Sequence, residues 1–269
     1  RQDDGGDVQV LPSGLTKIGD YAFDSSEAFR YFTVPAGVLD IGYDAFYDTS
    51  WYNHLPEGQV AYAGKVAYCY VVSKAYDYEM PEGYQLVFRP DTTAIAAGAF
   101  WGESNLANVT FPASLTWIGK DAFFACESLT KVALPKTVKT IGDYAIGFTY
   151  GEDDPELLAG FKMYCSAGSA GLAYAQENGI TRYVPATPGS PKAASASYNS
   201  VKVTWAKADD YVTGYRVYRA TVAAGPYTYL GTTGKTTFSY TDTGRTTGVT
   251  YYYKIVAERS VLGAKIYSS

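Results

Sequence analysis

Aromatic rings are the side chains in this sequence whose types and spacing most directly suggest chemistry. Tyr47, Trp101 and Phe124 each follow a regularly placed phenylalanine by one residue, and Trp51 and Trp117 lie nearby in the chain. Ring faces exposed in a row can pack against a sugar ring or a protein partner. The alternative, which the sequence favours, is that the rings pack on one another between successive turns of the chain.

Titratable and nucleophilic side chains form no catalytic pattern that we recognise. The single histidine, His54, has no neighbouring ligand residues, so we expect a surface or hydrogen-bonding role. Cys69, Cys126 and Cys165 show no C-x-x-C spacing. We expect Cys126 to be a small buried residue, and a disulfide between Cys69 and Cys165 is left open.

Carboxylates are plentiful, but no motif places a pair of them. The acidic run at residues 151–155 (GEDDP) lacks the alternating oxygen ligands of a calcium loop, so a solvated turn is expected. No serine-hydrolase, zinc-protease or phosphate-loop motif occurs. We therefore predict a protein that is not an enzyme and that has no metal site and no cofactor.

The aromatic residues belong to a 23-residue repeat, seen most clearly at residues 118–140. One column of the repeat contains Phe23, Phe46, Phe100, Phe123 and Ile146. Five residues before each of these stands an isoleucine, in a column made of Ile18, Ile41, Ile95, Ile118 and Ile141. A fixed period of this length is typical of a solenoid, because one copy alone cannot bury its apolar residues.

Each copy contains a short strand with one buried face. In the clearest copy, Val132 and Leu134 alternate with Lys131 and Ala133, and Pro135 ends the strand. A second extended run leads to the next isoleucine, and a tight helical turn is expected before the phenylalanine.

The outward positions of these strands form columns, in which Gln85, Val87 and Ala133 are included. The column residues predicted to bind a ligand are Tyr31, Thr33, Asn108, Thr110 and Lys131.

The pattern I-G-x-x-A-F-x-x-C-x-x-L-x-x-V-x-L-P-x-x-V resembles the BspA-like leucine-rich repeat of treponemal type, which is found mainly in bacterial surface and secreted proteins. The resemblance covers residues 8–184, after a polar tail at 1–7. It implies a leucine-rich-repeat solenoid of short parallel strands, mostly β with short helical turns. We expect a hairpin island at about 51–83, which the family also carries, and a C-terminal cap at about 161–184.

A second domain is predicted at residues 192–269, after a proline-rich linker at 185–191. Short β-type runs separated by turn signals favour an all-β sandwich. Trp205, the G-Y-R-V-Y-R run from Gly214 and the tyrosine-corner position of Tyr251 resemble the fibronectin type III family. No Arg-Gly-Asp tripeptide occurs, so integrin binding through that motif is excluded.

Charge differs between the two parts of the chain. Residues 1–185 carry 12 basic and 23 acidic side chains, whereas residues 186–269 carry 10 and 4. Neither part has a dense basic stripe, so no nucleic-acid partner is expected. No run of 18 apolar residues occurs, so no membrane insertion is expected either. We expect a monomer.

The sequence thus predicts a non-catalytic recognition or adhesion module of a bacterial cell-surface or secreted protein. Because the chain begins at Arg1 without a signal sequence, we interpret it as a trimmed, extracellular fragment. The leading hypothesis is a host or neighbouring-cell protein as ligand, bound by the repeat surface. A carbohydrate-binding accessory module that uses the aromatic column and a structural spacer are the alternatives.

Overall fold

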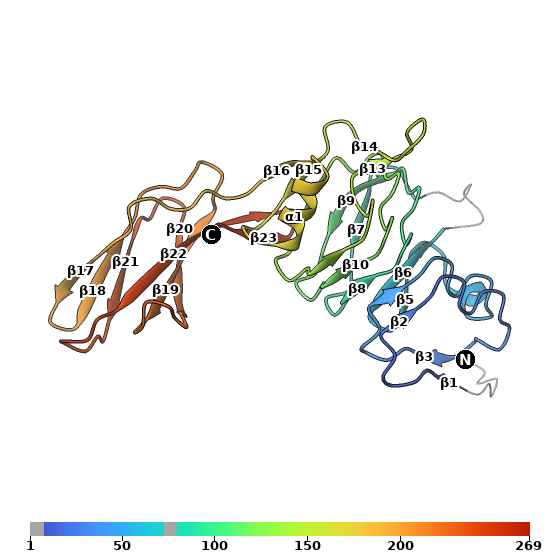
Figure 1. Ribbon diagram of the computed structural model, residues 1–269, viewed down its shortest axis with the longest axis horizontal. Coiled ribbons are helices and arrows are strands. Elements are labelled where there is room, and N and C mark those ends of the chain that lie inside the picture. The colour runs from blue at the N-terminus through green and yellow to red at the C-terminus, as the bar shows by residue number, and fades with distance from the viewer. Residues whose placement is uncertain (1–7, 73–79) are drawn as a thin grey trace.

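The computed structural model describes residues 8–72 and 80–269 (Figure 1). The predicted polar tail at 1–7 and residues 73–79 of the predicted hairpin island lie outside the described residues. A leucine-rich-repeat solenoid is followed by an all-β fibronectin type III-like sandwich, as the sequence predicts, and the two form one elongated molecule.

One wall of the solenoid consists of the short repeat strands, which run parallel. β1 pairs with β3, β7 pairs with β9, and β15 lies between β11 and β16. The strands are β1 (Gln9–Val10), β3 (Phe32–Thr33), β7 (Tyr84–Val87), β9 (Leu106–Thr110), β11 (Lys131–Ala133), β15 (Lys162–Tyr164) and β16 (Thr181–Tyr183). The predicted alternation is present in part: Lys131 is exposed and Val132 is fully buried, but Ala133 is also fully buried.

The isoleucine column forms a second wall of two-residue strands. β2 pairs with β4, and β12, β10 and β8 pair in that order, all in parallel. The strands are β2 (Lys17–Ile18), β4 (Asp40–Ile41), β8 (Ala94–Ile95), β10 (Trp117–Ile118) and β12 (Thr140–Ile141). The isoleucines of paired strands lie opposite each other, as Ile95 and Ile118 do.

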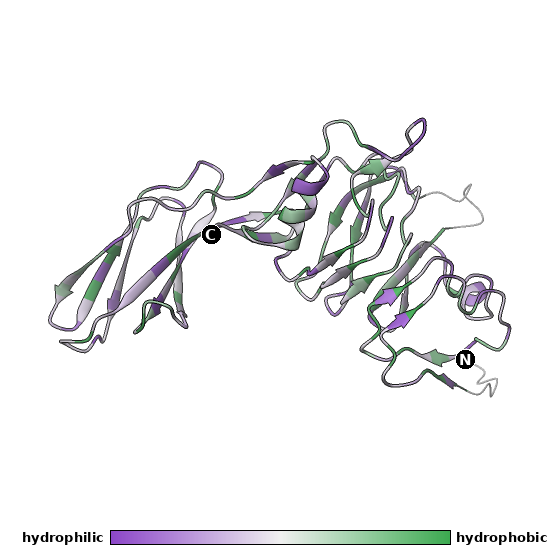
Figure 2. Ribbon diagram, viewed as in Figure 1, coloured by the Kyte–Doolittle hydropathy of each residue, from purple (hydrophilic) through white to green (hydrophobic). Residues whose placement is uncertain are grey.

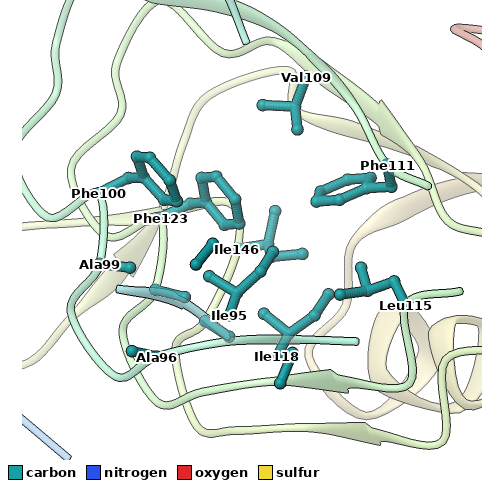
Figure 3. Packing of buried hydrophobic residues seen from close by; sticks show 14 of the residues in the cluster. Ile95, Ala96, Ala99, Phe100, Val109, Phe111, Leu115, Ile118, Phe123 and Ile146 are labelled. Carbon is teal, nitrogen blue, oxygen red and sulfur yellow. The ribbon is translucent and has the colours of Figure 1, made fainter. Parts of the chain in front are cut away.

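Between the walls the phenylalanine column forms the core. The rings of Phe100 and Phe123 stack with centroids 5.1 Å apart, above Ile95 and Ile118 (Figure 3). The N–H groups of Phe23, Phe100 and Phe123 each donate to a carbonyl of the next coil, as Phe123 does to Ala145 at 2.8 Å. The buried rings and the backbone ladder thus act between the same neighbouring coils.

The segment before each phenylalanine, where the sequence predicts a tight helical turn, is a hydrogen-bonded turn. Its residue two positions before the column adopts a left-handed backbone in every copy, with φ between 47° and 62° at Tyr21, Asp44, Gly98, Asp121 and Tyr144. A left-handed residue cannot continue a right-handed helix, so the turn ends at once.

The glycine after the isoleucine permits the close stacking of coils. A Cβ added at Gly119 would lie 2.5 Å from the backbone nitrogen of Ala97, and one at Gly142 would lie 2.5 Å from that of Lys120. The third copy carries Ala96 instead of glycine. There the N–H of Ala96 donates to the carbonyl of Ala67 and not to the isoleucine carbonyl of the preceding repeat. The third copy therefore has a different backbone partner at this position.

The predicted island contains a β-hairpin that stands in the place of a coil. β5 (Gln59–Ala63) and β6 (Val66–Val71) pair antiparallel around Gly64, whose φ is +66°. β6 then pairs in parallel with β8, so the hairpin extends the isoleucine wall. A 3-10 helix, η1 (Tyr52–His54), precedes the hairpin.

The solenoid ends with two elements before the sandwich. β13 (Phe148–Thr149) and β14 (Glu156–Leu157) flank the predicted acidic loop, which projects from the solenoid and is hydrophilic (Figure 2). The predicted cap contains the helix α1 (Ala170–Glu177). The backbone N–H of Leu172 in this helix donates to the Ser169 hydroxyl. Tyr174 and Ala175 of α1 are buried against the last coil.

Seven strands form the sandwich, as two antiparallel sheets. One sheet has the order β17-β18-β21 and the other β20-β19-β22-β23. The strands are β17 (Lys192–Ser197), β18 (Ser200–Thr204), β19 (Gly214–Ala220), β20 (Thr228–Gly234), β21 (Ser239–Thr243), β22 (Tyr252–Val261) and β23 (Ala264–Tyr267). Trp205 and Tyr215 lie in its core, and the Tyr251 hydroxyl accepts from Thr246 N–H at 3.1 Å, as at a tyrosine corner.

Backbone hydrogen bonds join the sandwich to the end of the solenoid. The N–H of Ala167 donates to the Tyr267 carbonyl at 2.8 Å, and the N–H of Tyr267 donates to the Ser166 hydroxyl at 3.1 Å. β23 therefore lies beside the segment that follows β15, and the chain end at Ser269 lies at this junction (Figure 1).

Side chains reinforce the junction. The Arg259 guanidinium of the sandwich lies 4.8 Å and 4.5 Å from the ring centroids of Tyr164 and Tyr183 in the solenoid. The Asp209 carboxylate accepts hydrogen bonds from the Tyr183 hydroxyl and the Ala186 N–H, at 2.8 and 2.9 Å. Partial burial opposes ionisation of Asp209, but these hydrogen bonds outweigh it and hold its pKa below the usual value.

Candidate recognition surfaces

Four rings on the turns of the solenoid form what we call the aromatic cluster: Tyr43, Trp101, Phe124 and Tyr150. The Trp101 ring lies 5.9 Å from Tyr43 and 5.2 Å from Phe124, and Phe124 lies 5.0 Å from Tyr150. The geometries are tilted or edge-to-face, which aromatic pairs prefer. The cluster thus crosses from the second repeat to the fifth.

The aromatic cluster combines the two interpretations that the sequence allowed. Phe124 is 4% exposed, so it supports the other rings from below and does not face a ligand. Trp101 and Tyr150 are 45% and 63% exposed. The Trp101 indole N–H donates to the Tyr150 hydroxyl at 2.7 Å, which fixes one ring against the other. The exposed part of the cluster is therefore a pair of held rings.

Sequence reasoning missed Tyr43 and Tyr150 as members of this cluster. Neither stands in the column that follows the phenylalanine, so the repeat period gave no signal for them. Tyr43 reaches across the third turn because Gly98 has no side chain, since a Cβ there would lie 2.8 Å from the Tyr43 ring. Its hydroxyl donates to the Asp121 carboxylate, and burial together with that bond raises the pKa of Tyr43.

Tyr47, the other predicted member of the column, lies at a separate place. It is 50% exposed and packs on Tyr52 with ring centroids 5.4 Å apart. Both rings line a hollow of about 330 Å³ together with Asp48 and Asn53, whose side chains hydrogen-bond to each other at 2.8 Å. The island hairpin follows this coil, so the column is interrupted after Tyr47.

The predicted repeat surface is partly assembled by strand register. Asn108 lies opposite Gln85, Thr110 lies opposite Val87, and Lys131 lies opposite Lys162. Val87 is 67% exposed, Gln85 and Lys131 are exposed, and Asn108 is half-buried. These amide, aliphatic and cationic side chains form a strip across β7, β9, β11 and β15. We call it the repeat strip, and its members are Gln85, Val87, Asn108, Lys131 and Lys162.

Thr110 marks the edge of the repeat strip. The turn between β22 and β23 approaches it so closely that a Cβ added at Gly263 would lie 2.5 Å from the Thr110 methyl carbon. Ala133, the next residue in that column, is fully buried. Thr110, which the sequence places among the ligand-binding residues, is half-buried, as Asn108 is, and its methyl group lies against the turn of the sandwich.

Thr33 lies on β3 and Tyr31 directly precedes it, at the N-terminal end of the solenoid (Figure 1). Both are exposed, and the Arg30 guanidinium lies 5.5 Å from the Tyr31 ring. Within the described residues β3 pairs with β1 and not with β7, because the island interrupts the wall. The structure thus separates these two predicted residues from Asn108 and Lys131.

Thiol and imidazole groups are held in ordinary environments. All three cysteines are free, and burial raises the pKa of Cys69 and of Cys165 to about 12. The Cys126 thiol is buried and donates to the Phe100 carbonyl at 3.1 Å. His54 is exposed, and its Nδ1 lies 2.6 Å from the Ser50 carbonyl. These thiols are protonated at neutral pH, so they are poor nucleophiles.

Residues 8–72 and 80–269 contain no group of three or more His, Cys, Asp or Glu side chains placed to hold a metal ion. None of the helices in those ranges is long and apolar enough to cross a bilayer.

Comparison with known families matches the solenoid. The profile of the BspA type leucine rich repeat region matches residues 8–85 and 72–150, with six copies. No curated protein matches the chain.

Solved structures similar to this chain are fibronectin type III-like proteins. A Fn3-like protein from Clostridium thermocellum is 37% identical, over 32% of this chain and 86% of that chain, with a TM-score of 0.27. The sixth fibronectin type III domain of the human fibronectin type III domain containing protein 3 is 25% identical, over 32% of this chain and 79% of that chain, with a TM-score of 0.26.

A structure of titin kinase and its flanking domains is 22% identical, over 32% of this chain, and its TM-score is 0.26. The chain spans 16% of that titin structure. Scores this low do not establish a fold, so the sandwich assignment rests on the strand order and core described above.

Proposed function

Because this chain belongs to the BspA-type leucine-rich repeat family, we propose that it is a non-catalytic recognition or adhesion module whose repeat strip binds a protein ligand. Solenoids of this kind offer extended surfaces for binding and place few groups in dry pockets. We further propose an extracellular location, at the surface of a bacterium or secreted from it, and a division into two domains at residues 185–191.

The observation that supports a protein ligand is the composition of the repeat strip. It combines an exposed aliphatic side chain, Val87, with the amides of Gln85 and Asn108 and with two cations. Neutral, apolar and charged groups on one face of the sheet suit a protein interface, which is about as apolar as the rest of a protein surface.

The two cations of the repeat strip favour a partner with acidic groups. Lys131 and Lys162 lie directly opposite each other in register, and neither forms an ion pair within the described ranges. Like charges placed opposite each other on a sheet cost stability. A carboxylate of the ligand placed between the two ammonium groups would relieve this repulsion.

The aromatic cluster supports the second candidate function, carbohydrate binding. Trp101 and Tyr150 are exposed and fixed to each other, and a rigid ring pair is suited to stacking on a sugar. The indole N–H of Trp101 is already used, so a sugar would gain ring contacts and not that hydrogen bond. If neither surface binds a ligand, a structural spacer is the remaining function.

A binding screen tests the proposal. The chain is applied to immobilised extracellular-matrix and mucin proteins and, in parallel, to glycans, together with Val87→Glu plus Lys131→Glu and, separately, Trp101→Ala. We expect protein binding that the double variant abolishes and that Trp101→Ala leaves unchanged. Val10→Glu is the matched surface control, since Val10 is 76% exposed on β1 and outside the strip.

Each other outcome rejects the proposal in a defined way. Glycan binding that is lost with Trp101→Ala would assign the function to the aromatic cluster. Protein binding that survives the double variant would place the interface elsewhere on the molecule. If the chain binds neither the proteins nor the glycans, the remaining function is that of a structural spacer. Thermal melts of all variants distinguish a lost interface from a lost fold.

A further inference from the structure

A cavity of about 380 Å³ lies where the sandwich meets the solenoid. The solenoid contributes Lys136 and Ala167, and the sandwich contributes the rest from β19, β22, β23, the turn before β20 and the two residues after β23. The sandwich residues are Arg216, Tyr218, Tyr227, Lys254, Val256, Tyr267, Ser268 and Ser269. Junctions between domains are preferred places for ligand sites, because both domains supply groups to one cavity.

The cavity is positively charged. Lys136, Arg216 and Lys254 line it, and its described lining includes no aspartate or glutamate. Lys136 and Lys254 are exposed and form no ion pair with any described residue. Two of the three cations come from the sandwich, whose residues 186–269 carry 10 basic and 4 acidic side chains.

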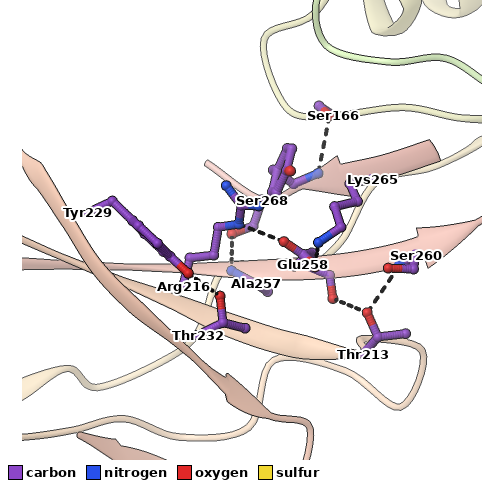
Figure 4. Close-up of polar contacts among 11 residues, drawn as sticks. Ser166, Thr213, Arg216, Tyr229, Thr232, Ala257, Glu258, Ser260, Lys265 and Ser268 are labelled. Carbon is purple, nitrogen blue, oxygen red and sulfur yellow. Dashed lines mark hydrogen bonds and ion pairs between the residues drawn. The ribbon is translucent and has the colours of Figure 1, made fainter. Parts of the chain in front are cut away.

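Arg216 is held in a fixed position at the floor of the cavity. Its Nε donates to the Glu258 carboxylate at 2.6 Å, and Glu258 also pairs with Lys265 at 3.1 Å (Figure 4). The Arg216 guanidinium lies 4.8 Å from the Tyr267 ring and 5.5 Å from the Tyr229 ring. Glu258 balances the charge at this point, so the uncompensated charge of the cavity comes from the two lysines.

We propose that this cavity is a binding site for an anionic sugar residue, whose acidic group meets Lys136 and Lys254. The site goes beyond the proposed function, because it shares no residue with the repeat strip or with the aromatic cluster. It also joins the two domains through one ligand, since Lys136 follows β11 and Lys254 lies on β22.

A sugar fits the remaining lining better than an acidic peptide does. The rings of Tyr218, Tyr227 and Tyr267 lie in the lining and can contact a sugar ring. The hydroxyls of Tyr227, Ser268 and Ser269 are already bonded within the chain, so they contribute no free donor to a sugar. The volume holds one or two sugar residues. A single aspartate or glutamate side chain would use the lysines and leave the tyrosines without contacts.

The test is calorimetric titration of the full chain with oligosaccharides of matched length. The carboxylated arm is a hyaluronan tetrasaccharide, the sulfated arm a chondroitin sulfate tetrasaccharide, the neutral arm chitotetraose and the peptide arm tetraglutamate. Any tag is placed at the N-terminal end, because Ser269 lines the cavity. We expect binding in one or both anionic sugar arms, with affinity that falls as salt is raised.

Matched variants locate the site. Lys136→Gln and Lys254→Gln should each weaken binding about tenfold, the effect of losing one charge-assisted hydrogen bond. The controls Lys139→Gln and Lys202→Gln change the same charge outside the cavity lining, on the solenoid and on β18, and should bind as the unaltered chain does.

Three results would overturn the proposal. They are equal binding of tetraglutamate, equal binding of the neutral sugar, and equal weakening by the control lysines. The third result would indicate only general attraction to a basic surface. None of these variants touches the repeat strip, so failure here and failure of the proposed function are observed independently.

Discussion

The hydroxyl oxygen of Tyr68 accepts a hydrogen bond from the backbone N–H of Phe46 over 2.9 Å. In uninterrupted coils the equivalent N–H donates to a carbonyl of the next coil, as Phe100 does to Ala122 at 2.9 Å. At the end of the solenoid, the Tyr174 hydroxyl accepts from Ile146 N–H at 3.1 Å. At both places where the repeat is interrupted, a tyrosine hydroxyl thus accepts the hydrogen bond that a carbonyl of the next coil would otherwise accept.

Tyr68→Phe should lower the free energy of unfolding of the solenoid. The variant leaves the buried N–H of Phe46 without an acceptor, which costs about 1–3 kcal/mol. Urea unfolding followed by circular dichroism measures the loss, and Tyr174→Phe should behave alike. Tyr21→Phe, at a side chain 60% exposed, is the control and should change stability by less than about 0.5 kcal/mol. Equal losses at Tyr21 and Tyr68 would refute this role.

Gly119→Ala should destabilise the solenoid because of the spacing between coils. The added methyl would lie 2.5 Å from the nitrogen of Ala97 and 2.7 Å from the carbonyl carbon of Ala96, and backbone atoms cannot move aside alone. We expect a loss of about 1–3 kcal/mol or a failure to fold. Gly14→Ala is the control, since a Cβ there meets nothing within 4 Å. The same urea experiment, with an unchanged midpoint for Gly119→Ala, would disprove the explanation.

Arg259→Ala should loosen the junction between solenoid and sandwich. The guanidinium lies between the rings of Tyr164, Tyr183 and Tyr211, and desolvated cation–ring contacts contribute about 0.5–2 kcal/mol each. We expect a larger radius of gyration by small-angle X-ray scattering and faster proteolysis at residues 185–191. Arg245→Ala removes a cation–ring contact inside the sandwich and should change neither measurement. Identical scattering from all three chains would contradict the prediction.

Acid should weaken the same junction through Asp209. Because hydrogen bonds from Ala186 and Tyr183 lower its folded pKa despite burial, Asp209 adds stability above its unfolded pKa of about 4, and that contribution is lost as the pH falls below this value. The difference in melting temperature between the unaltered chain and Asp209→Asn should therefore shrink from pH 7 to pH 3. Asp210→Asn, which removes a surface pair with Lys207, is the control. A difference that is constant with pH would count against this account.

The elements with a strong local pattern were predicted from the sequence. The short β-type runs predicted in residues 192–269 include β18 (Ser200–Thr204), and the cap predicted at about 161–184 contains α1 (Ala170–Glu177). β17 was missed because its residues, KAASAS, are all exposed and small, so no alternation marks it. Its place is set by pairing with β18.

The candidate site was predicted in part. The repeat period identified Trp101 and Phe124, because their column repeats with the core residue beside it. It did not identify Tyr150, whose contact with Trp101 arises from the path of the fifth coil. Nor did the repeat period predict that Tyr47 and Trp101 lie in different surroundings, because the hairpin between them is not part of the repeat.

The sequence by itself determined the coils, because a 23-residue period acts between neighbours that bury the same residues in the same order. The tertiary structure alone decided which outward residues are open. Thr110 and Asn108 have the same outward position in the pattern and are both half-buried, yet Thr110 lies against Gly263 of the sandwich whereas Asn108 lies opposite Gln85 in the strip. That difference depends on how a second core docks against the first, through contacts such as those of Arg259, which no local periodicity encodes.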